Sequence, residues 1–157
     1  MKNQIKQLVV LLAFIVGTLA VGYLSSLATA VSIKSAYAVL VKPSFFPPAW
    51  VFAPVWTILY TLMGISAYLV WKTKENIKAP MSIFAIQLFF NFLWTIIFFG
   101  MGQYLLAFIE IILLLALIVL TMVSFSKRSK VAAWILLPYL LWVSFASILN
   151  LTIWLIN

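Results

Sequence analysis

Five long apolar runs alternate with short polar or proline-rich segments along the chain. Each run holds about 20 residues or more, the length that a helix needs to cross a hydrocarbon core of about 30 Å. The segments between the runs carry charges and prolines, which favour turns. The pattern predicts an all-α membrane protein, a single domain formed by a bundle of five transmembrane helices at about residues 5–30, 48–71, 80–99, 104–125 and 131–156.

The first apolar run has an alternative interpretation as a cleaved signal peptide, because Lys2 and Lys6 precede it and small residues at 28–30 end it. The apolar core of a signal peptide has about 7 to 15 residues. This run is apolar over most of residues 8–24, which is longer. We therefore expect a first helix that is retained in the protein.

Prolines predict where the helices begin and where they bend. Three of them in the segment 34–48 exclude a continuous helix, so we expect the longest loop there. Pro48 and Pro80 are suited to the first turn of a helix, where the missing amide proton costs nothing. Pro54 and Pro138 fall inside predicted helices, where each frees a backbone carbonyl and favours a kink. Such a kink either makes room for a cavity or only curves the helix within the bundle, and the sequence does not decide between these two roles.

Composition and charge agree with a lipid-facing exterior. The chain is 67% hydrophobic and 8% charged, too apolar to supply the polar surface of a soluble protein. The net charge of +8 does not indicate a nucleic-acid partner, because the basic residues lie between the apolar runs and form no continuous patch. Eight of the ten fall on one side of the predicted topology. By the positive-inside rule we expect a cytoplasmic N-terminus and an outward-facing loop 34–48, in a cell membrane.

The absence of cysteine and histidine limits the possible chemistry. Disulfides, cysteine or histidine metal sites, a Ser-His-Asp triad and a histidine-ligated haem are all excluded. We expect no metal site and no resident cofactor.

Glu110 is an acid about a third of the way into the fourth predicted helix. A charged carboxylate inside a membrane costs about 2.5 to 3.5 kcal/mol on insertion scales, which makes this residue a possible functional acid. The alternative is a protonated or hydrogen-bonded acid that ties helices together. The sequence leaves these two interpretations balanced.

Small and polar residues recur at intervals of four on three of the predicted helices, which places each set on one helix face. The first set is Gly22, Ser26 and Ala30, and it suits close contact with another helix. The second set is Gln87, Asn91 and Thr95, and it predicts interhelical hydrogen bonds or part of a ligand cavity. A comparable row is Trp142, Ala146 and Asn150, which offers a flat wall, a gap and a polar contact.

Seven tryptophans are many for a chain of this length. Aromatic belts at the membrane interfaces account for Trp71 and Trp154, which lie near predicted helix ends. Trp56 and Trp142 lie deeper, each about a third of the way into its helix. The depth of these two residues leaves open whether their rings meet.

Together these motifs resemble the translocator protein family, whose members are also called tryptophan-rich sensory proteins or peripheral-type benzodiazepine receptors. The resemblance covers nearly the whole chain. It rests on Lys42-Pro43-Ser44, Pro47-Pro48, Trp50, Pro54-Val55-Trp56, Leu59-Tyr60, Met63-Gly64, Gln87-Leu88, Asn91, Trp94, Phe98-Phe99-Gly100, Pro138-Tyr139-Leu140, Trp142, Phe145-Ala146 and Leu149-Asn150.

The resemblance implies a five-helix, homodimeric membrane protein that binds porphyrins and other tetrapyrroles, and isoquinoline carboxamide or benzodiazepine-type drugs. Its role would be sensing, transport or stress regulation. Protoporphyrin IX would be a ligand or substrate, with its carboxylates near Lys34 or Lys42. The implied pocket lies beneath the first loop and is lined by Tyr37, Trp50, Ala53, Trp56, Asn91, Trp94, Thr95, Trp142, Phe145, Ala146 and Leu149.

Two alternative functions remain. The first is a light- and oxygen-dependent enzyme that degrades porphyrin, in which Trp56 and Trp142 would be the catalytic residues, as the resemblance implies. The second is a small proton-coupled exporter that uses Glu110. Such exporters typically place the acid in the first of four helices, whereas here it lies in the fourth of five.

The chain departs from the family pattern in two places. Ala36 and Phe45 stand where many members have tryptophan, so we expect the loop to close differently. Animal members carry a sterol-recognition segment with a basic end after the fifth helix, whereas this chain ends at Asn157. We therefore do not expect sterol binding through that segment. The overall resemblance is to bacterial members of the family.

Overall fold

The computed structural model describes the backbone of residues 2–35 and 39–157, and the side chains of 3–30 and 39–157. Within these residues the chain forms helices and no strands. The elements are α1 (Lys2–Ser35), α2 (Ala49–Thr73), α3 (Lys78–Thr95), the π-helical turn η2 (Ile96–Gly100), α4 (Tyr104–Ser126), α5 (Lys130–Ile135) and α6 (Leu137–Ile156).

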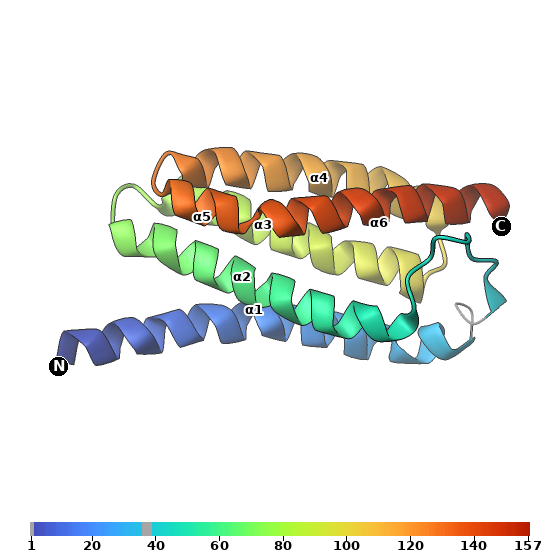
Figure 1. The fold of residues 1–157 in the computed structure, drawn as a ribbon, viewed down its shortest axis with the longest axis horizontal. Coiled ribbons are helices and arrows are strands. Elements are labelled where there is room, and N and C mark those ends of the chain that lie inside the picture. Colours follow the sequence, from blue (N-terminus) through green and yellow to red (C-terminus); the bar gives the residue numbers. More distant parts are fainter. Residues whose placement is uncertain (1, 36–38) are drawn as a thin grey trace.

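The described residues contain five helical segments that are long and apolar enough to cross a membrane, which confirms the predicted all-α bundle. They are Asn3–Ala30, Ala49–Thr73, Lys78–Gly100, Tyr104–Ser126 and Lys130–Ile156. The helices lie side by side along the long axis of the molecule (Figure 1). The start of α1 and the α2–α3 and α4–α5 turns gather at one end, where most of the basic residues are. The C-terminus and the loop 39–48 lie at the other end.

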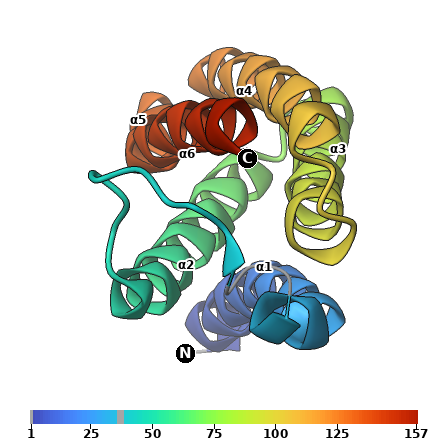
Figure 2. The ribbon, with the colours of Figure 1, turned by 90° about the vertical axis from the view of Figure 1, so that its right-hand side faces the viewer.

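Viewed from the loop end, α1 and α2 occupy one side of the bundle and α3, α4 and α6 the other (Figure 2). The loop 39–48 passes across this end. The last residue of the chain holds the loop there with two hydrogen bonds: the Val41 amide donates to Asn157 Oδ1 at 3.0 Å, and Asn157 Nδ2 donates to the Val41 carbonyl at 3.1 Å.

Helices α1 and α2 pack closely where glycine removes a side chain from their contact. A Cβ atom built on Gly64 would lie 2.7 Å from the Ile15 Cα atom. One built on Gly22 would lie 2.3 Å from the Tyr60 ring, so this ring occupies the space above Gly22. Thr18 Oγ1 also donates to the Tyr60 carbonyl at 2.7 Å. Of the small face predicted at Gly22, Ser26 and Ala30, only the first position lies against α2 in this way, because Ser26 and Ala30 are exposed.

The segment predicted as one helix at 131–156 is divided at Leu136. Pro138 has no amide proton to donate to the Trp134 carbonyl, and the Leu136 amide bonds to the Ala133 carbonyl at 3.1 Å. The Ala132 carbonyl, which Leu136 would satisfy in a continuous helix, instead accepts a 2.7 Å hydrogen bond from Ser66 Oγ on α2. The other internal proline, Pro54, lies within the continuous helix α2.

We predict that Gly64→Ala destabilises the protein and that Gly17→Ala does not. Gly64→Ala should lower the free energy of unfolding by about 1 to 3 kcal/mol, because its methyl group would collide with the α1 backbone. A methyl group on Gly17 would meet no neighbouring group within 4 Å, so this substitution should be neutral or stabilising by up to about 1 kcal/mol. Thermal unfolding of both variants in detergent measures this, and an unchanged midpoint for Gly64→Ala would contradict the close contact.

Candidate functional site

A cavity of about 620 Å³ lies between α1, α2 and the end of α3. Four of the predicted pocket residues line it: Ala53, Trp56, Trp94 and Thr95. The remaining lining residues come mainly from α1 and the first half of α2. They are Leu19, Gly22, Tyr23, Ser25, Ser26, Thr29, Ala49, Phe52, Thr57, Tyr60 and Phe99.

Small side chains on one face of α2 leave room for this cavity. Ala49, Ala53 and Thr57 follow one another at intervals of four and all line it, so the space beside this part of α2 is not filled by α2 itself. Farther along the helix, Tyr60 packs over Gly22 and closes the cavity toward the Gly64 contact. The cavity therefore occupies the half of the bundle nearest the loop 39–48.

The cavity walls are mainly apolar and aromatic, with hydroxyl groups between the rings. The hydroxyls of Ser25, Thr29 and Thr57 each donate to a carbonyl one turn earlier in their own helix, at 2.8 to 2.9 Å. Their protons are thus already used, and their oxygen lone pairs remain as acceptors. The cavity suits a flat hydrophobic ligand with few polar groups.

A buried hydrogen-bonded network joins α2, α3 and α6 next to the cavity. The Tyr60 hydroxyl donates to Asn91 Oδ1, and Asn91 Nδ2 donates to the Tyr139 hydroxyl at 3.0 Å. The Tyr139 hydroxyl in turn donates to Gln87 Oε1 at 3.0 Å. Asn91 is buried and is not among the residues that line the cavity. Asn91 and Gln87 therefore form interhelical hydrogen bonds, the first of the two roles that their spacing allowed.

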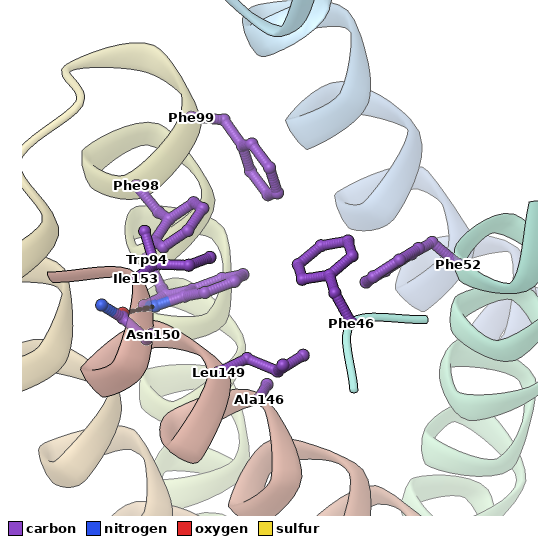
Figure 3. Close-up of a pocket in the computed structure, with 9 residues that line it drawn as sticks. All are labelled: Phe46, Phe52, Trp94, Phe98, Phe99, Ala146, Leu149, Asn150 and Ile153. Atoms are coloured by element: carbon purple, nitrogen blue, oxygen red, sulfur yellow. Dashed lines mark hydrogen bonds between the residues drawn. The ribbon is translucent and has the colours of Figure 1, made fainter. Parts of the chain in front are cut away.

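A second cavity, of about 30 Å³, lies on the α6 side of the same region (Figure 3). It is lined by the predicted residues Ala146 and Leu149, and it shares Phe52, Trp94 and Phe99 with the larger cavity. Trp94 Nε1 donates to Asn150 Oδ1 at 3.0 Å, which fixes the indole across this space. The remaining lining residues are Phe46, Phe98, Asn150 and Ile153.

Phe46, from the loop 39–48, reduces this second cavity. Its ring stacks on Phe52 with centroids 5.5 Å apart, and Figure 3 shows the two rings facing Trp94 and Phe99 across the opening. Lys42 Nζ lies 5.7 Å from the Phe46 ring centroid. The loop therefore stands between the large cavity and the α6 residues that were predicted to line it.

Trp56 and Trp142 are connected through intermediate rings. The Trp56 ring lies 6.5 Å from Tyr139, which is one turn before Trp142 on α6. The Trp142 ring lies 5.9 Å from Phe52, which is one turn before Trp56 on α2. The two tryptophans therefore belong to one aromatic cluster. Of the two, only Trp56 lines the large cavity.

The other predicted residues lie away from the large cavity or outside the described part of the chain. Trp50 is 75% exposed, and Phe145 packs beside Trp142 with centroids 5.9 Å apart. Tyr37 lies outside the described residues, as does the side chain of Lys34. Glu110 is buried in α4 and lines neither cavity; neither of its carboxylate oxygens has a hydrogen-bond partner among the described residues.

Sequence reasoning missed the contribution of α1 to the cavity. The spacing of Gly22 and Ser26 predicts a small face for helix packing, and both residues line the cavity. The additional signal was the hydroxyl groups of Ser25 and Thr29, one turn apart on the same helix. A run of small and hydroxyl residues fits a helix contact and a cavity wall equally well.

Comparisons with known proteins agree with the sequence motifs. Residues 14–155 match the model of the TspO/MBR family. The chain is 46% identical to the tryptophan-rich protein TspO of Chlorobaculum tepidum, over 97% of this chain and 98% of that protein. It is 40% identical to the translocator protein of Homo sapiens, over 75% and 72% of the two chains. It is 37% identical to the tryptophan-rich sensory protein of Cereibacter sphaeroides, over 69% and 68%.

We predict that Asn91→Leu lowers the free energy of unfolding by about 1 to 3 kcal/mol, because it removes the partner of the buried Tyr60 hydroxyl. Thr95→Val, one turn farther along α3, is the matched control. The Thr95 hydroxyl donates to the Asn91 carbonyl of its own helix, so its loss should change stability by about 0.5 kcal/mol or less. Thermal unfolding compares the two variants, and equal effects would contradict a structural role for the network.

Proposed function

Because the chain belongs to the TspO/MBR family of multi-pass membrane proteins, we propose that it binds porphyrins or other tetrapyrroles in the cavity between α1, α2 and α3. The observation that carries the proposal is the cavity itself, about 620 Å³ in volume and lined by Phe52, Trp56 and Phe99. Isoquinoline carboxamide or benzodiazepine-type drugs would occupy the same space. The bound ligand would serve sensing, transport or stress regulation.

The size and lining of the cavity support this class of ligand. Its volume lies within the range of about 300 to 1,000 Å³ that is usual for small-molecule pockets. A flat macrocycle gains from offset stacking on aromatic faces, which contributes about 0.5 to 1.5 kcal/mol per ring pair beyond area burial. Trp56 is half-buried on the cavity wall, so its indole is available for such contact.

The loop 39–48 offers a cation for the carboxylates of a porphyrin. Lys42 lies in this loop, above the ring of Phe46, at the end of the bundle that holds the cavity. An ammonium group that pairs with a carboxylate strengthens the hydrogen bond between them. The α6 residues Trp142, Ala146 and Leu149 lie beyond Phe46 and Phe52. We therefore expect them to contact only a ligand that moves the loop aside.

We predict saturable quenching of tryptophan fluorescence when protoporphyrin IX is added to the purified protein. Trp56→Leu should raise the dissociation constant about two- to tenfold, since it removes one stacking partner. Trp134→Leu is the control, because Trp134 is 68% exposed and lines neither cavity. A wild-type protein without saturable quenching, or equal effects of the two substitutions, would contradict binding in this cavity.

A second candidate function is favoured by the aromatic cluster that joins Trp56 to Trp142. In light- and oxygen-dependent porphyrin degradation, the excited macrocycle would pass its energy to oxygen. The excited oxygen would take one electron from Trp56 on the cavity wall and become superoxide, and the oxidised indole would take one electron from the macrocycle. Contacts through Phe52 and Tyr139 would extend the path to Trp142.

For this second function we predict that illumination in air bleaches the Soret band of bound protoporphyrin IX, and that Trp56→Phe and Trp142→Phe slow the bleaching. Trp134→Phe should bleach at the wild-type rate, because that ring lies outside the cluster. Absorbance is followed under light, in the dark and without oxygen. Equal bleaching in all four proteins would remove the proposed role of the two rings.

A further inference from the structure

The large cavity has an open side that faces away from the centre of the bundle. Five of its lining residues are themselves exposed: Tyr23 and Ser26 on α1, and Ala49, Ala53 and Thr57 on α2. Thr29, by contrast, is fully buried, and its methyl group lies 4.0 Å from a Cβ position at Gly100. The cavity is therefore closed where α1 meets η2 and open between α1 and α2.

The two helices separate toward the loop end. They touch backbone to backbone at Gly64 and Ile15, and through Tyr60 at Gly22. Beyond Tyr60, the α2 residues that line the space include the small side chains of Ala53 and Thr57. Figure 2 shows the ends of α1 and α2 nearest the viewer lying apart. Both helices belong to segments apolar enough to cross a membrane, so the opening lies at a depth where lipid surrounds the protein.

Water is a poor occupant for this space. A volume of 620 Å³ equals that of about 20 water molecules at about 30 Å³ each. Ordered water needs two to four polar partners, whereas these walls are mainly hydrocarbon and several of their hydroxyl protons are used within their own helices. An empty space would lose the dispersion contacts of its walls. Hydrocarbon chains are the solvent immediately outside the opening.

We propose that an acyl chain of a membrane phospholipid enters between α1 and α2 and occupies this cavity when no other ligand is present. The chain lies against Leu19, Phe52 and Trp56 and passes the small residues at the opening. This site does not depend on porphyrin binding. It makes the binding of any other ligand an exchange with lipid, and it gives membrane-dissolved molecules a lateral route into the bundle.

The experiment uses the protein in nanodiscs made with phosphatidylcholine that carries a diazirine near the end of one acyl chain. After illumination, mass spectrometry of peptides locates the carbene adducts. We expect adducts on the buried or half-buried walls at Phe52, Trp56 and Trp94, in addition to lipid-facing residues such as Ile58, which is 58% exposed. No porphyrin is present, so the result is independent of the proposed function.

Two variants test the route. Ala53→Phe places a ring at the opening and should reduce the wall adducts several-fold while leaving exterior adducts unchanged. Ile58→Phe adds a ring to the lipid-facing side of the same helix and should leave both unchanged. Wild-type protein without adducts on the cavity walls would overturn the proposal, whether water or a second copy of the chain fills the opening. Equal wall labelling in all three proteins would overturn entry between α1 and α2.

Discussion

The buried hydrogen bonds from Tyr60 through Asn91 and Tyr139 to Gln87 determine how the bundle is arranged. In a membrane, water is not available to satisfy a polar group, so each of these side chains must find its partner on another helix. The network joins α2, α3 and α6 at one level of the bundle. Tyr60 also lies over Gly22, so the same residue links α1 to this network and ends the large cavity.

Cavity and close packing are consequences of residue size along the same two helices. Where Gly64 faces Ile15, the α1 and α2 backbones meet, and no space remains between them. Where Ala53 and Thr57 face α1, the helices have separated and the small side chains do not fill the gap. The π-helical turn η2 completes the site by bringing Phe99 to the opposite wall, and such turns occur frequently at functional sites.

Much of the fold could be predicted because helix length and hydropathy respond directly to the membrane. Ala53, Trp56, Trp94 and Thr95 line the large cavity, whereas Ala146 and Leu149 lie behind Phe46. The sequence could not reveal this, because the position of a loop ring depends on contacts formed only in the folded chain. Pro138 predicts a bend in the fifth helix, but the sequence could not show that Ser66 from another helix would satisfy the Ala132 carbonyl at the division.

The division between α5 and α6 also has a mechanical consequence. At Leu136 a side-chain hydrogen bond from Ser66 replaces a main-chain one, so fewer main-chain hydrogen bonds resist bending here than in a continuous helix. Helix α6 extends from this point to Asn157, whose amide holds the backbone of Val41. A tilt of α6 at Leu136 would therefore displace Val41, and with it the loop that carries Phe46, by more than it displaces the residues next to Leu136.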